Sequence, residues 1–120
     1  MNSLATAAAR AETELSDAAA AMSIGNMGRA RVSARRGVGA FLQTVAAALP
    51  TDPGPHAMAN LRWVQLHPEL PDEIRAAAAR LLGGPRNIAR GEQASDNPIN
   101  DARMVIEYFQ QTLPDCSTQC

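Results

Sequence analysis

Arginine is the residue type whose chemistry stands out in this sequence. All eleven basic residues of the 120-residue chain are arginines, and four of them fall within eight positions. A guanidinium group matches the paired oxygens of a phosphate, and a helix N-terminus also attracts anions. The cluster therefore predicts a phosphate-binding edge at the start of a helix. Arg31 and Arg35 flank the apolar stripe of that helix, whereas Arg29 and Arg36 lie on its outer side.

A structural role for the same arginines stays open. Glu12, Glu14 and Asp17 belong to the preceding helical segment. Any of these carboxylates could pair with Arg31 or Arg35 across the two helices. Such pairs would neutralise the arginines and leave a packing contact in place of a binding site.

The two histidines do not form a recognisable catalytic or metal-binding set. His56 lies in a proline-rich loop, and His67 follows Arg62 by five residues. Five residues on a straight helix place two side chains roughly 140° apart. The spacing of Cys116 and Cys120 is a weak zinc pattern, and both lie far from the histidines in the sequence. We therefore predict neither a metal nor a cofactor, and an Arg62/His67 ribonuclease is the least favoured hypothesis.

Three large side chains lie off the predicted apolar stripes. Trp63 points away from the apolar face of its helix, and Met104 and Tyr108 lie four residues apart, opposite Phe109. A ridge of large apolar side chains on a small domain favours association. Trp63, Met104 and Tyr108 thus suggest a homodimeric protein-interaction module without a nucleic-acid role. The alternative is that neighbouring helices of the same chain cover them.

Five helical segments must position these side chains. Apolar residues recur at helical spacing in each segment, and prolines, glycines and asparagines separate the segments. Gly37 and Gly39 lower the helix propensity of the second segment, which indicates that another element packs closely there. We predict helices over 3–22, 27–49, 57–67, 71–82 and 98–113.

These segments predict an all-α fold. Short connections between helices favour an antiparallel up-and-down bundle of four to five helices. Alanine supplies 24 of the 120 residues, and such small side chains let helix axes approach closely. We expect one domain over 1–114 and a flexible tail over 115–120 that carries Cys116 and Cys120 as free thiols.

Charge and hydropathy exclude several classes of protein. A formal net charge of −1 gives no overall basic field, so non-specific coating of DNA is excluded. No apolar run is long enough for a membrane span, and Met1–Arg10 lacks the pattern of a secretory signal. We expect a cytoplasmic protein that does not interact with membranes.

The order of these features resembles that of HEPN-domain proteins, a family of small prokaryotic helical proteins. The resemblance implies an all-α bundle, frequent dimerisation and a role tied to nucleotides or RNA, in some members beside a nucleotidyltransferase partner. The stretches that carry it are Gly25–Arg31, Ala34–Leu42, His56–Leu61, Leu70–Arg75, Ala79–Leu81, Asn100–Arg103 and Ile106–Phe109.

The resemblance also implies a test for catalysis. Ribonuclease members of the family carry an arginine, often followed by asparagine, and a histidine after four to six further residues. Arg86-Asn87 begins such a motif, but Gly91, Glu92 and Gln93 occupy the positions where the histidine should fall. Without an imidazole, no residue of this motif can act as the general acid or base. We therefore predict a non-catalytic protein.

The leading hypothesis combines these observations. It is a non-catalytic, HEPN-like accessory protein that binds a nucleotide, RNA or a partner protein. The predicted binding residues are Arg31 and Arg35 on the second helix, with Arg86 and Arg90 in the polar segment before the last helix.

Overall fold

The computed structural model of the chain describes residues 3–83 and 94–113. All regular structure in these two ranges is helical, so the predicted all-α fold is confirmed. The predicted tail over 115–120, with both cysteines, lies outside the described residues. The elements are α1 (Ser3–Ser23), α2 (Met27–Thr44), the 3-10 turn η1 (Ala46–Ala48), α3 (Ala57–Leu66), α4 (Asp72–Leu82) and α6 (Pro98–Thr112).

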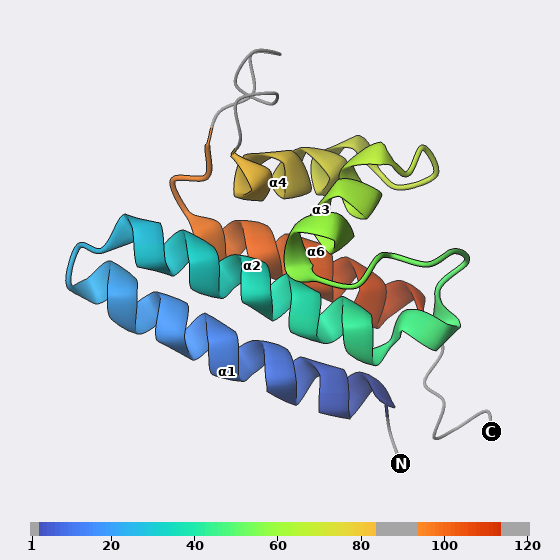
Figure 1. Cartoon of the computed structure of the whole chain (residues 1–120), viewed down its shortest axis with the longest axis horizontal. Helices are drawn as coiled ribbons and strands as arrows, with labels where there is room; N and C mark the ends of the chain where they lie inside the picture. The colour runs from blue at the N-terminus through green and yellow to red at the C-terminus, as the bar shows by residue number, and fades with distance from the viewer. Residues whose placement is uncertain (1–2, 84–93, 114–120) are drawn as a thin grey trace.

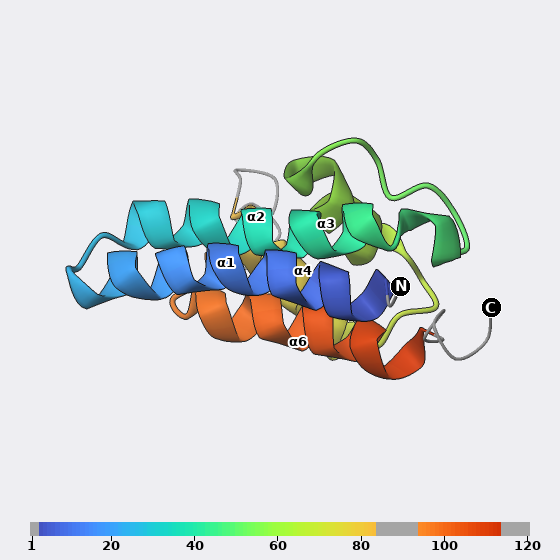
Figure 2. The same ribbon diagram turned by 90° about the horizontal axis from the view of Figure 1, so that it is seen from below.

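The helix α2 lies at the centre of the bundle. In both ribbon views α1, α2 and α6 run along the long axis of the molecule (Figures 1 and 2). Figure 1 shows α3 and α4 on the side of α2 that faces away from α1. Contacts join α2 to α1, α3, α4 and α6. No helix in the described ranges is long and apolar enough to cross a membrane.

Local sequence signals explain where most helices begin and end. The backbone of Gly25 takes a φ of +78°, which a side chain would disfavour, and turns the chain after α1. The side chain of Asn26 then caps α2 by accepting a hydrogen bond from the Arg29 amide at 3.1 Å. Asn97 caps α6 in the same way, with Pro98 in the first turn. The predicted boundaries at these positions are confirmed.

The end of α2 differs from the prediction. The α-helix stops at Thr44, and the chain tightens into η1 before Pro50. Ala46–Ala48 form η1, and alanine favours helix, which is why the sequence predicts a longer helix over 27–49. Short 3-10 turns of this kind are common where an α-helix ends.

The predicted apolar faces form the core. Ala34, Val38 and Phe41 of α2 are buried, and so is Val45 directly after it. Helix α1 contacts both α2 and α6, so it is buried on more than one side. The other predicted positions that are buried are Ala11, Leu15, Ala18, Leu61, Val64, Ile74, Ala77, Ala78, Leu81, Leu82, Ala102, Val105, Ile106 and Phe109.

A buried asparagine holds the proline-rich connection before α3. Asn60 is fully buried, and its amide nitrogen donates to the carbonyl oxygens of Pro53 at 2.8 Å and Gly54 at 3.0 Å. Its amide oxygen accepts from Nε2 of Gln43 on α2 at 3.2 Å. All its polar capacity is thus used to fix a loop that lacks regular structure of its own.

Glycines let α2 approach two of its neighbours closely, as the sequence predicts. A Cβ atom on Gly37 would lie 3.2 Å from Cδ2 of Leu15 on α1. A Cβ atom on Gly39 would lie 2.8 Å from Cβ and 3.0 Å from Cα of Ala57 on α3. Leu15 can rotate to relieve the first contact. The second contact involves the backbone of α3 and has no such relief.

We expect Gly39→Ala to destabilise the fold. Strain of about 2 kcal/mol from overpacking exceeds the gain of about 0.5–1 kcal/mol in helix propensity. The matched control is Gly28→Ala in the first turn of α2, where the nearest heavy atom to a new Cβ is 3.9 Å away. Urea unfolding should show a lower midpoint for Gly39→Ala and an equal or higher one for Gly28→Ala. Equal shifts in the two variants would contradict close packing at Gly39.

Candidate functional site

Arg31 and Arg35 donate hydrogen bonds to backbone carbonyl groups. The Nε atom of Arg31 lies 2.8 Å from the carbonyl oxygen of Ser95, and Nε of Arg35 lies 2.6 Å from that of Leu81. Leu81 belongs to the last turn of α4, where carbonyl groups lack helical partners and attract cations. Arg35 therefore connects α2 to the end of α4, and Arg31 connects α2 to Ser95, shortly before α6.

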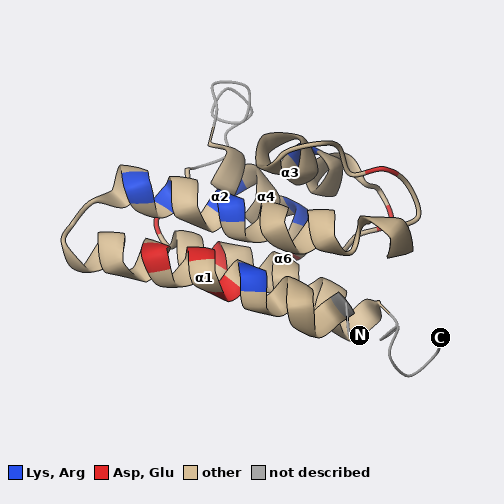
Figure 3. Ribbon diagram, turned by 60° about the horizontal axis from the view of Figure 1, so that its bottom comes forward, with Lys and Arg blue, Asp and Glu red and all other residues tan. Residues whose placement is uncertain are grey.

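The alternative pairing with acids of α1 does not occur. None of the ion pairs among the described residues involves Arg31 or Arg35. Glu12 forms a bidentate pair with Arg103 on α6, with Nη2 and Oε2 3.2 Å apart. This hydrogen bonding lowers the pKa of the Glu12 carboxyl. Figure 3 shows acidic residues on α1 and arginines on the neighbouring α2.

The two arginines form a locally uncompensated pair of positive charges. Both take part in part-buried hydrogen bonds. Burial lowers the pKa of Arg35, and the positive charge of Arg31 lowers it further. Arginine nevertheless stays charged, because its ordinary pKa is far above neutral. Carbonyl dipoles hold these charges in place but do not cancel them.

The carbonyl partners lie at the two ends of the segment that carries the other predicted binding residues. The amide of Ser95 donates to the carbonyl oxygen of Arg80 at 2.9 Å, so the chain leaves α4 and returns at the same place. Arg86 and Arg90 lie outside the described residues. In the sequence they lie between Leu81 and Ser95, whose carbonyl oxygens accept from Arg35 and Arg31.

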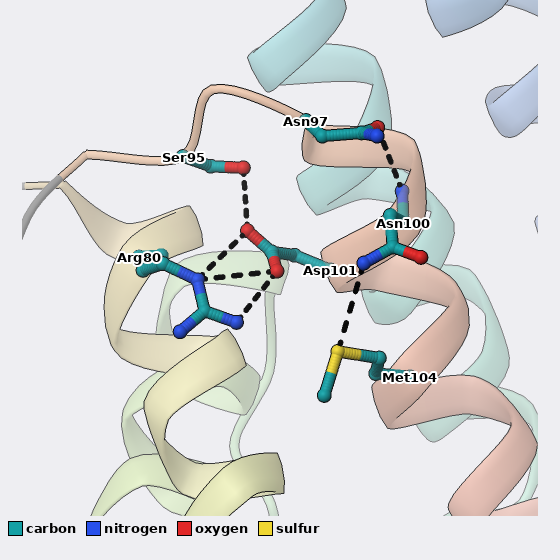
Figure 4. Close-up of polar contacts among 6 residues, drawn as sticks. All are labelled: Arg80, Ser95, Asn97, Asn100, Asp101 and Met104. Carbon is teal, nitrogen blue, oxygen red and sulfur yellow. Dashed lines mark hydrogen bonds and ion pairs between the residues drawn. The ribbon is translucent and has the colours of Figure 1, made fainter.

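A buried carboxylate beside this place was not predicted. Asp101 is 4% exposed and accepts from Arg80 through Nη2 at 2.7 Å and Nε at 3.2 Å. The hydroxyl group of Ser95 donates to the same carboxylate at 2.6 Å. Figure 4 shows Arg80 and Ser95 converging on Asp101 from two sides. Asp101 lies one helical turn before the buried Val105, on the apolar face of α6. An acid on such a face is the sequence signal that could have predicted a buried carboxylate here.

This cluster cancels its own charge. The hydrogen bonds to Asp101 raise the pKa of Arg80, against the opposing effect of burial, and the charges of Asp101 and Asp96 also raise it. Ser95 connects the cluster to Arg31, because its hydroxyl group contacts Asp101 and its carbonyl oxygen accepts from Arg31. Arg80 and Asp101 therefore form a structural pair, and the net positive charge rests on Arg31 and Arg35.

The predicted interface residues are half-buried. Trp63 donates from Nε1 to Oγ1 of Thr51 at 2.7 Å. The ring of Tyr108 packs edge-on against Phe109, with centroids 5.3 Å apart. Met104 also packs against the core. Neighbouring helices thus cover part of each side chain, and a homodimer through Trp63, Met104 and Tyr108 stays a prediction.

Large apolar side chains are most exposed elsewhere. Ile24 is 78% exposed, Leu66 64% and Val32 41%, and the sequence did not single out any of them. They lie at the end of α1, near the end of α3 and on α2.

The histidines remain apart from the arginine site. His67 ends α3 and accepts a hydrogen bond on Nδ1 from the Glu69 amide at 3.4 Å, whereas His56 caps the start of α3. Arg62 is exposed, and no hydrogen bond or ion pair between described residues links it to His67. Within the described ranges, no group of three or more histidine, cysteine or acidic residues could hold a metal ion.

The comparisons with known proteins add no relative. No protein-family model, curated protein or solved structure matches the chain. The HEPN family therefore remains a resemblance that rests on the residues quoted above.

We expect Asp101→Asn to destabilise the fold by about 2 kcal/mol. Removing one partner of a buried pair leaves the other charge uncompensated, and the partial exposure of Arg80 moderates that cost. The control is Asp96→Asn, an exposed acid directly before the cap of α6, which should change stability by less than about 0.5 kcal/mol. Urea unfolding measures both. Similar losses in the two variants would show that the buried carboxylate has no special role.

Proposed function

We propose that this chain is a non-catalytic, HEPN-like helical-bundle protein of the cytoplasm that binds the phosphate groups of RNA or a nucleotide. Arg31 and Arg35 form the described part of the site, and Arg86 and Arg90 complete it from the adjoining segment. The observation that carries the proposal is that backbone carbonyls, and not carboxylates, hold Arg31 and Arg35.

The hydrogen bonds leave the phosphate-binding atoms available. Each bond uses Nε–H, one of the five N–H donors of a guanidinium. The described residues make no hydrogen bond to the terminal nitrogens of either arginine. Those nitrogens are the atoms that commonly bind phosphate in pairs. Fixing Nε also orients the guanidinium before binding, which reduces the entropy lost on binding.

Electrostatics favour an anion at this place. Burial is the larger cause of the lowered pKa of Arg35, and the positive charge of Arg31 lowers it further, so the two arginines repel each other. A phosphate between them would offset that repulsion and stabilise the folded state. Because the chain as a whole carries a charge of −1, attraction for an anion is local to this end of the molecule.

The resemblance implies several partners, and the evidence for each of them differs. RNA and nucleotides fit the arginine pair through their phosphates. A nucleotidyltransferase partner rests on the resemblance alone. A homodimer through Trp63, Met104 and Tyr108 has weaker support, because these side chains pack against their own core.

The test compares two double variants of the same helix. Arg31→Gln/Arg35→Gln removes the proposed site, and Arg29→Gln/Arg36→Gln removes the same charge from exposed positions. Fluorescence anisotropy with a labelled single-stranded RNA, and with a labelled nucleotide, measures binding directly. We expect the first variant to bind at least tenfold more weakly and the second to stay within about threefold of the original chain.

Stability is measured alongside, because Arg31 and Arg35 also hold the fold. Loss of two part-buried hydrogen bonds should cost about 1–3 kcal/mol, so binding is measured well below the Tm of the variant. Arg31→Lys/Arg35→Lys keeps the charge and should recover part of the affinity. Equal weakening in both glutamine variants, or no binding of either ligand by the original chain, would refute the proposed site.

A further inference from the structure

A cavity lies at the other end of α6 from Ser95 and Asp101. Its volume is about 190 Å³, and it lies between α3, the last turn of α6 and the connection that follows η1. Trp63, Tyr108 and Phe109 supply aromatic lining, and Glu69 lies at the same cavity. The proposed phosphate site uses none of these residues.

The aromatic side chains form a fixed wall. The centroids of the Trp63 and Phe109 rings lie 6.0 Å apart, with 32° between the ring planes. The Tyr108 ring packs edge-on against Phe109. The Nε1 hydrogen bond to Thr51 fixes the indole of Trp63. Phe109 is buried, so the two rings that contact it rest on the core.

The charges at the cavity favour a cation. Among the described residues that line it, Glu69 is the one acid and none is an arginine. His67 also lines the cavity, and its Nδ1 accepts a hydrogen bond from the Glu69 amide. The cavity therefore combines aromatic rings with a single negative charge.

We propose that this cavity binds a small organic ammonium cation with methyl groups on the nitrogen. The negative face of an aromatic ring attracts such cations, and a nearby carboxylate strengthens the attraction. The methyl groups would pack against the aliphatic side chains of Leu70 and Leu113. The volume lies below the roughly 300 Å³ at which drug-sized ligands begin, so the cavity suits a compact head group.

The only tryptophan of the chain lines the cavity and reports its occupancy. The full chain is titrated with choline and with its neutral isostere, in which a tert-butyl group replaces the trimethylammonium group. We expect a saturable change in Trp63 fluorescence with choline and binding of the isostere at least tenfold more weakly. Equal binding of the two compounds would mean that the cavity is merely apolar. That result, or no saturable change with choline, would overturn the proposal.

Matched variants locate the binding. Glu69→Gln should weaken choline binding about fivefold, whereas Glu73→Gln, an exposed acid on α4 outside the cavity, should leave it unchanged. Tyr108→Leu should weaken binding about fivefold, and Tyr108→Phe should retain it. Unchanged binding in Glu69→Gln, or an equal loss in Glu73→Gln, would refute the role of Glu69.

The two sites are distinguished by a cross-test. The variant Arg31→Gln/Arg35→Gln should bind choline as the original chain does, because neither arginine lines the cavity. Failure of RNA binding with intact choline binding would overturn the phosphate site alone. The reverse result would overturn the cation site alone.

Discussion

The close approach of α2 to its neighbours is the constraint on which the rest of the structure depends. Gly39 removes the side chain where the backbone of α3 comes nearest, and Gly37 does the same opposite Leu15 of α1. Contacts with α1, α3, α4 and α6 bury eight of the 18 residues of α2. Its arginines must therefore either emerge at the exposed edge, as Arg29 and Arg36 do, or find partners inside the bundle.

The arginines that connect one helix to another have two kinds of partner, and the difference bears on function. Arg80 meets the buried carboxylate of Asp101, and Arg103 meets Glu12, so both charges are cancelled within the fold. Arg31 and Arg35 meet backbone carbonyls, which orient a guanidinium without cancelling its charge. A structural arginine is most stable with an anion of its own. Two oriented arginines without one are suited to an anion that arrives from outside.

Much of the fold could be predicted because its determinants are local. Helical spacing, the cap at Asn97 and the pair Gly37 and Gly39 depend on residues within a few positions of one another. The partners of Arg31 and Arg35 could not be predicted, because a backbone carbonyl has no signature in the sequence. The contact of Asp101 with Arg80 was also missed, since it joins residues 21 positions apart on different helices.

The most direct test of the arginine site is the salt dependence of RNA binding. Each phosphate contact with a single strand contributes a slope of about −0.7 to log K plotted against log salt concentration. If Arg31 and Arg35 each contact one phosphate, the slope of Arg31→Gln/Arg35→Gln should be shallower than that of the original chain by about 1.4. Parallel lines for the two proteins would show that neither arginine contacts phosphate, and the proposed site would be wrong.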